Sequence, residues 1–269
     1  MINPVTPRAH AVPRPKFLSD HMPRALPLVS LSETVPANLL GRYDSYFRTQ
    51  AADTPALARI AQAIRYQVYC LERKFENADE HDNGLECDEF DAAAVHSLIF
   101  YRPSSEAIGT TRLILPHRAG ILPIERLLAE SDIRAADHFP LEACAEVSRF
   151  AISNRLRRGD DAQRDRECRS ALPCLGLIQE LLRQSRALGL THWAAVMEPK
   201  LLRMLAAMGI HFTPVGPLVS HHGLRQPSYC RLPEMLERLK RERPDHWLVV
   251  TEAGRLMLPE SAPLQRRAA

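Results

Sequence analysis

Two groups of charged residues have the types and spacing needed for acid–base chemistry. Glu86 begins an acidic cluster that continues with Asp88 and Asp91, and Glu146 precedes Arg149 by three residues. A reaction that removes a proton from a nucleophile needs a carboxylate or a water relay within hydrogen-bond reach. Because Glu86 opens the cluster, we take it as the first candidate for a general base. The alternative is that Glu86 is an exposed carboxylate on a solvated loop.

Arg112 and Glu146 lie in segments with the pattern of buried strands. Their neighbours Leu113 and Val147 are apolar, and charged side chains are rarely buried without a partner. We therefore expect Arg112 and Glu146 to face each other or a cleft. In an ideal strand Arg149 would point away from the face of Glu146, so we expect a β-bulge between them.

The aspartates of the acidic cluster have two possible roles. Asp88 and Asp91 could bind the ammonium group of a substrate. They could equally pair with Arg65, Arg112 and Arg149 in a structural network, which is the interpretation we favour because buried guanidinium groups need partners.

Aromatic and histidine residues near these groups are open to two interpretations. Tyr69 and Phe75 could form the wall of a substrate pocket, although aromatic side chains at such spacing are more often part of a core. The pair His221 and His222 has no acidic or thiol partner at ligand spacing, so we expect no metal there. The six cysteines form no CxxC pair, and we interpret them as structural thiols in a reducing compartment.

The elements that must position these groups alternate between strands and helices. We expect strands at 43–49, 95–101, 108–115, 145–152, 193–197 and 247–251, with two more flanking 216–229. We expect helices from the cap at 53–55 to about 72, and at 124–129, 168–187, 199–209 and 233–241. This order predicts a mixed α/β sheet flanked by helices in a single domain.

Composition limits the cellular setting and the partners. The chain has 269 residues, of which 45% are hydrophobic and 25% charged, and its net charge of +3 is too small to favour nucleic-acid binding. Residues 1–40 are proline-rich, which predicts a loosely ordered arm. We expect residues 41–258 to form the folded domain and residues 259–269 to form a flexible tail. We find neither a signal peptide nor an apolar run long enough to cross a membrane, and we expect a cytoplasmic protein.

The candidate residues occur in an order that is more specific than any single motif. The order is Arg65-Tyr-Gln-Val-Tyr69, Phe75, Glu86-x-Asp88-x-x-Asp91, Gly109-x-x-Arg112 and Glu146-Val-Ser-Arg149. This ordered set resembles the autoinducer (acyl-homoserine lactone) synthase family. The chain looks more similar to two relatives of that family, the N-acyl amino acid synthases and the acyltransferases that accompany PEP-CTERM/exosortase systems. The resemblance to the latter group extends over about residues 43–232 and is carried best by residues 64–72 and 200–229.

The resemblance implies a GNAT-like fold with a mostly antiparallel sheet, and transfer of a fatty acyl group from a thioester to an amine. It implies catalytic roles for Glu86, Arg112, Glu146 and Arg149, and substrate binding by Arg65, Tyr69, Phe75, Asp88 and Asp91. Such an enzyme needs oxyanion donors, a slot between splayed strands for the thioester arm, and an apolar tunnel for the acyl chain. Acyl carrier protein (ACP) or coenzyme A (CoA) would be a co-substrate, and we expect no bound cofactor or metal.

One segment departs from the pattern of GNAT enzymes, whose acetyl-CoA signature, (Q/R)xxGx(G/A), follows the central strand. Residues 153–160 occupy this place, with Leu156 where Gln or Arg is usual. We therefore expect a carrier-bound donor, and expect Arg155, Arg157 and Arg158 to attract the acidic carrier protein. The alternatives are an S-adenosylmethionine-dependent acyl-homoserine lactone synthase and a non-catalytic module that binds acyl chains or ACP.

Overall fold

The computed structural model describes residues 38–81, 83–157, 162–220 and 223–257. The predicted tail at 259–269, the predicted arm up to residue 37, Arg158 and the pair His221–His222 lie outside these ranges. In the part of the chain that is described, no helix has both the length and the apolar character needed to cross a membrane.

A central sheet runs through the described residues. Its strands are β1 (Phe47–Ala51), β2 (Ala94–Tyr101), β3 (Glu106–Ile114), β4 (Cys144–Ile152), β5 (His192–Met197), β6 (Thr213–Pro214), β7 (Val219–Ser220) and β8 (Leu224–Arg231). They lie in the order β1-β2-β3-β4-β5-β8-β6, and β7 pairs with β8. Every pairing is antiparallel except the one between β4 and β5. The mixed, mostly antiparallel sheet is therefore as predicted.

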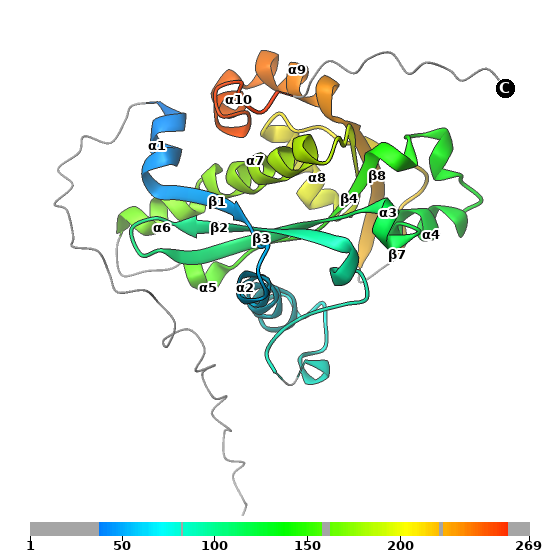
Figure 1. Ribbon diagram of the computed structural model, residues 1–269, viewed down its shortest axis with the longest axis horizontal. Coiled ribbons are helices and arrows are strands. Elements are labelled where there is room, and N and C mark those ends of the chain that lie inside the picture. Colours follow the sequence, from blue (N-terminus) through cyan, green and yellow to red (C-terminus); the bar gives the residue numbers. More distant parts are fainter. Residues whose placement is uncertain (1–37, 82, 158–161, 221–222, 258–269) are drawn as a thin grey trace, which may run out of the picture. The chain divides into compact units, whose positions relative to one another are not determined.

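Helices cover both faces of this sheet (Figure 1). They are α1 (Leu39–Tyr46), α2 (Pro55–Arg65), α3 (Pro116–Ala119), α4 (Pro123–Ala129), α5 (Asn154–Arg157), α6 (Ala162–Arg169), α7 (Leu172–Ala187), α8 (Pro199–Ala207), α9 (Leu232–Glu242) and α10 (Pro244–Val250). A π-helix, η2 (Tyr66–Glu72), continues α2, and short 3-10 turns include η3 (Ala78–Glu80), η4 (Asp91–Ala93), η5 (Ala135–Asp137) and η6 (Leu141–Ala143). The largest core lies between the sheet and α7, whereas α2 covers the opposite face.

The alternation of side chains along the strands places the candidate residues on the α2 face. Leu113 and Val147 belong to the core under α7, so their neighbours Arg112 and Glu146 point to the other side of the sheet. Two apolar clusters cover that other side, one built on α2 and one on α4. The charged residues therefore lie on one face, between two apolar clusters.

The only parallel pairing in the described sheet is also the shortest of its central pairings. β4 and β5 are paired at three positions, which end at Glu146 opposite Ala194. β5 continues to pair with β8 as far as Met197, whereas β4 remains paired with β3 as far as Ile152. The two strands therefore separate beyond Glu146, which is the splayed arrangement expected for a thioester arm.

Two predicted strand segments are helical instead. Residues 43–46 belong to α1, because the side chain of Asn38 caps the helix by accepting a hydrogen bond from Gly41 N. Residues 247–250 belong to α10, which Pro244 begins and which buries Val249 and Val250. Short apolar runs do not distinguish a strand from a buried helix, and local capping decided both cases.

Close packing of α7 on the sheet predicts the effect of one substitution. A Cβ atom at Gly176 would lie 2.6 Å from Ile99 Cδ1 and 2.9 Å from Tyr43 Cε2. We expect Gly176→Ala to lower the free energy of unfolding by about 1–3 kcal/mol, because overpacking outweighs the helix propensity of alanine. Urea unfolding would measure this change, and an unchanged or increased stability would contradict it.

Candidate active site

A β-bulge in β4 brings Glu146 and Arg149 to the same face of the sheet. Thr110 pairs with Ala151 and Arg112 with Ser148, so β4 contains one residue more than β3 in this interval. Arg149 has a φ of 50°, a left-handed conformation that is uncommon for residues other than glycine. The predicted bulge is confirmed, and its irregular backbone lies directly beside the charged residues.

Arg65, at the end of α2, is buried, and its guanidinium group lies between two carboxylates. Its Nε donates to Glu86, and its Nη1 lies 2.5 Å from Asp91 Oδ1. Arg112 on β3 is 2% exposed and donates to Asp91 and, at 2.6 Å, to Asp88 Oδ2. The end of α2, the acidic segment and β3 are therefore joined by ion pairs.

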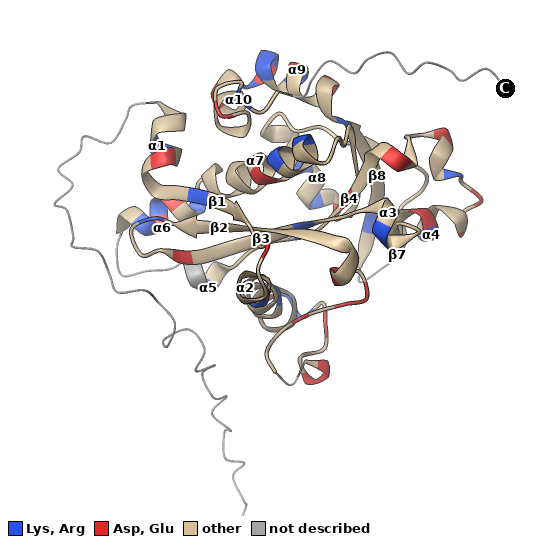
Figure 2. Cartoon of the chain, viewed as in Figure 1, with Lys and Arg blue, Asp and Glu red and all other residues tan. Residues whose placement is uncertain are grey.

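Arg149 closes this network from β4. Its Nη2 lies 2.9 Å from Glu86 Oε1, 3.1 Å from Asp88 Oδ2 and 3.4 Å from Glu76 Oε1. Its guanidinium carbon also lies 5.4 Å from the centre of the Tyr69 ring. Figure 2 shows acidic residues along the chain between α2 and β2.

The arginines keep the network carboxylates ionised. Burial would raise the pKa of Glu86, but hydrogen bonds and charges from Arg65 and Arg149 outweigh it and hold that pKa below its usual value. Burial would likewise raise the pKa of Asp88, but the hydrogen bonds and the charge of Arg112 outweigh it and lower that pKa to about 2. The aspartates thus occupy the network that we favoured from the sequence, and their binding of a substrate ammonium stays a prediction.

Glu146 has a different environment from Glu86. Its side chain is buried, and Oε2 accepts one hydrogen bond from the backbone N–H of Ile124, at 2.7 Å. Burial raises the pKa of Glu146 to about 7, with opposing but smaller effects of Ile124 and Arg112. A carboxyl group with this pKa can exchange a proton near neutral pH. Arg112 is joined to the aspartates and to Ser148 rather than to Glu146.

The two aromatic candidates lie side by side at the edge of the network. The ring centres of Tyr69 and Phe75 are 6.2 Å apart, and the Tyr69 hydroxyl donates to Phe150 O at the bulge, at 3.4 Å. Arg225 of β8 lies 5.2 Å from the Phe75 ring and 2.9 Å from Glu198 Oε1. Phe75 therefore connects the network to β8 across the region where β4 and β5 separate.

The predicted carrier-binding arginines are only partly described. Arg155 is exposed, and its Nη1 donates to Gln67 Oε1 at 3.3 Å. Arg157 lies in α5, but its side chain is outside the described part, as is all of Arg158.

Sequence reasoning missed Glu72, whose carboxylate accepts hydrogen bonds from the segment after β4. Its position at the end of the matched stretch 64–72 was the only available signal.

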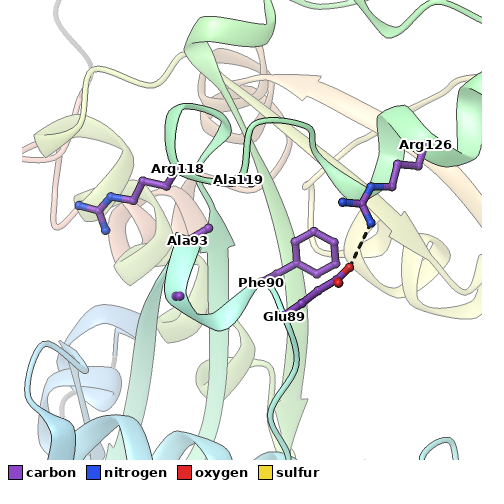
Figure 3. A pocket seen from close by; sticks show the side chains of 7 residues that line it. Glu89, Phe90, Ala93, Arg118, Ala119 and Arg126 are labelled. Atoms are coloured by element: carbon purple, nitrogen blue, oxygen red, sulfur yellow. Dashed lines mark hydrogen bonds and ion pairs between the residues drawn. The ribbon is translucent and has the colours of Figure 1, made fainter.

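A shallow pocket of about 260 Å³ opens next to the acidic segment, between η4 and the helices α3 and α4. The guanidinium carbon of Arg126 lies 5.2 Å from the centre of the Phe90 ring, and its Nη1 lies 3.0 Å from Glu89 Oε1. Figure 3 shows that Arg118 points away from this group. Because its cations do not converge, the pocket has no evident ligand.

Removal of the Arg112 side chain tests the network directly. We expect Arg112→Ala to abolish acyl transfer and to lower the free energy of unfolding by about 3–5 kcal/mol, because it leaves Asp88 without its main partner and Asp91 with Arg65 as its remaining arginine partner. Thermal unfolding and an acyl-transfer assay would measure both effects, with Arg112→Lys as the charge-preserving control. Full activity in a folded Arg112→Ala protein would refute the assignment.

Acid should weaken the network through Asp88. A carboxyl whose pKa falls from 3.8 to about 2 on folding stabilises the fold above pH 3.8 and loses this effect as the pH falls to about 2. We expect Asp88→Asn to lower the free energy of unfolding at neutral pH by about 2 kcal/mol. The difference in this free energy between the variant and the wild type should become smaller as the pH falls from 3.8 to about 2. Urea unfolding across pH would measure it, and the exposed Glu89→Gln is the control. A pH-independent difference would contradict it.

Comparisons with known proteins agree with this fold. Residues 64–164 match the model of the acetyltransferase (GNAT) domain. TofI, crystallised with an inhibitor and MTA, is 21% identical, with a TM-score of 0.54, over 72% of this chain and 96% of its own. FeeM, an N-acyl amino acid synthase from uncultured soil microbes, is 18% identical, with a TM-score of 0.51, over 71% of this chain and 93% of its own.

A third structure is that of LasI, an acyl-homoserine lactone (AHL) synthase, which is 18% identical with a TM-score of 0.50, over 69% of this chain and 89% of its own. Among curated proteins, none matches the sequence significantly. At these identities the structural likeness establishes the fold, and the domain match establishes the enzyme class. The predicted GNAT-like fold is thus confirmed, and the chain is an acyltransferase with a GNAT domain at residues 64–164.

Proposed function

We propose that this enzyme is an N-acyltransferase that moves a fatty acyl group from an ACP or CoA thioester to the amine of an amino acid or a related small molecule. The observation that carries the proposal is the position of Glu146. It is a buried carboxyl with a pKa of about 7, and it is the last residue of β4 that pairs with β5. A thioester arm that entered between the separating strands would end beside it.

The reaction would proceed by attack of the amine on the thioester carbonyl. Glu146 in its carboxylate form takes a proton from the substrate ammonium, which frees the nitrogen lone pair. The new C–N bond forms as the carbonyl oxygen gains negative charge, and the C–S bond then breaks. The nitrogen gives up its second proton, which the leaving thiolate takes up, so the products are a neutral amide and a free thiol, and Glu146 holds the first proton.

The bulge and the ion-pair network would support this chemistry. A bulge leaves a backbone N–H outside the regular ladder, and such donors can stabilise an oxyanion. The network holds Arg149 in its left-handed conformation through Glu86 and Asp88, and this preserves the bulge. Glu86 is the weaker base in this arrangement, because two arginines lower its pKa. In this proposal it positions Arg149.

The second candidate function is synthesis of an AHL from S-adenosylmethionine. The likeness to the AHL synthase LasI and the ordered set from Arg65 to Arg149 support it. The resemblance of residues 200–229 to the acyltransferases that accompany PEP-CTERM/exosortase systems favours the first candidate. A role beside exosortase systems and a cytoplasmic location stay predictions from the sequence.

The direct test is the identification of the product. We expect mass spectrometry of lipid extracts from cells that express the wild-type protein to reveal a new N-acylated amino acid, which would give the acceptor and the chain length together. Lactone formation from S-adenosylmethionine and acyl-ACP would support the second candidate. Tight acyl-ACP binding without turnover over a broad panel of amines would support a binding module instead.

The role of Glu146 requires a substitution that preserves its hydrogen bond. Glu146→Gln keeps an acceptor for Ile124 N–H but removes the base, so we expect kcat to fall by about 100-fold or more. Wild-type kcat/KM should rise with pH through about 7 as Glu146 loses its proton, and the variant should lack this rise. Glu125→Gln is the matched control, because Glu125 also accepts a backbone hydrogen bond, from Leu122 N. Equal activity of the two variants would exclude Glu146 as the base.

A further inference from the structure

The carboxylate of Glu72, the last residue of η2, is held by four hydrogen-bond donors. Three come from the segment immediately after β4: Ser153 Oγ at 2.6 Å, Asn154 N at 2.9 Å and Arg155 N at 3.1 Å. The fourth is Gln67 Nε2, at 3.2 Å. Both carboxylate oxygens are thereby engaged, one of them by Asn154 and the other by the remaining donors.

These donors stand at the open end of the separation between β4 and β5. The strands are paired at Glu146 and separate beyond it, and β4 ends at Ile152, one residue before Ser153. A thioester arm that lies between the strands with its carbonyl near Glu146 would emerge toward Ser153. The N–H groups that Glu72 occupies are therefore those that a phosphate at the outer end of the arm would meet.

The segment is suited to an anion, and an internal anion already occupies it. Ser153 Oγ, Asn154 N and Arg155 N converge on the two oxygens of the Glu72 carboxylate. Partial burial would raise the pKa of Glu72, but the hydrogen bonds from Ser153, Asn154 and Arg155 outweigh it and lower that pKa. Glu72 is therefore negatively charged at neutral pH and repels a second anion at the same place.

We propose that Glu72 is a donor-selectivity residue: by occupying the donors of Ser153, Asn154 and Arg155, it disfavours acyl-CoA and leaves carrier-bound acyl groups as the preferred substrate. The inference rests on the proposed function, because it concerns the thioester that this site would use. It adds a residue that the motif comparison did not single out.

The selectivity between acyl-CoA and acyl-ACP follows from the contacts that would hold each thioester. CoA carries a diphosphate and a further phosphate, and its affinity depends on groups that neutralise them. A carrier protein is linked to the same arm through a single phosphodiester, and its own surface supplies additional contacts. Occupation of the N–H groups by Glu72 therefore removes a larger share of the binding energy from CoA than from a carrier protein.

The test compares the two donors with the same acyl chain. We expect Glu72→Gln to raise the ratio of kcat/KM for acyl-CoA to kcat/KM for acyl-ACP by about tenfold, a change that corresponds to about 1.4 kcal/mol. Glu80→Gln removes the same charge from the exposed turn η3, and we expect it to leave the ratio unchanged. A purely structural Glu72 would lower both kcat/KM values together, and this result would overturn the proposal.

A binding measurement separates this inference from the proposed reaction. Calorimetry with free CoA should give a dissociation constant about tenfold lower for Glu72→Gln than for wild type and for Glu80→Gln. If neither donor supports transfer but CoA binding tightens in this way, the proposed reaction fails and the role of Glu72 stands. If transfer occurs and the donor ratio does not change, the role of Glu72 fails and the reaction stands.

Discussion

The guanidinium groups of Arg65 and Arg112 are almost completely removed from water, and such charges are tolerated only beside opposite charges. Glu86, Asp88 and Asp91 meet this requirement from a segment that has little regular structure of its own. The network thereby joins the end of α2, the acidic segment, β3 and β4. A shift of any one of these elements would leave a charge without its partner, so the geometry of the whole face depends on these ion pairs.

Two glutamates on the same face have opposite pKa shifts. Glu86 lies between Arg65 and Arg149, whose charges keep it ionised and occupied. Glu146 lies among apolar residues with one backbone donor, and burial raises its pKa to about 7. Environments that move the pKa values of two carboxyl groups apart are a common means of assigning one to structure and the other to proton transfer.

The departure from the acetyl-CoA signature acquires a physical meaning in this arrangement. The hydrogen-bond donors of the segment after β4 are bound by the carboxylate of Glu72, which lies about eighty residues earlier in the chain. The π-helix that ends at Glu72 also carries Tyr69, which contacts Arg149 and the bulge. One irregular helix thus contacts both the bulge in β4 and the segment that follows β4.

The sequence alone indicated a mixed α/β sheet flanked by helices and named the charged residues that meet on the α2 face. The apolar neighbours of Arg112 and Glu146 indicated that both face one another or a cleft, and the spacing to Arg149 indicated where a bulge would be needed. Tertiary structure decided what local patterns leave open. Capping turned 43–46 and 247–250 into helices. Burial raised the pKa of Glu146, whereas Arg65 and Arg149 lowered that of Glu86. The partners of Glu72 lie about eighty residues away in the chain. Burial and long-range partners set pKa values and hydrogen bonds, and neither is a property of local sequence.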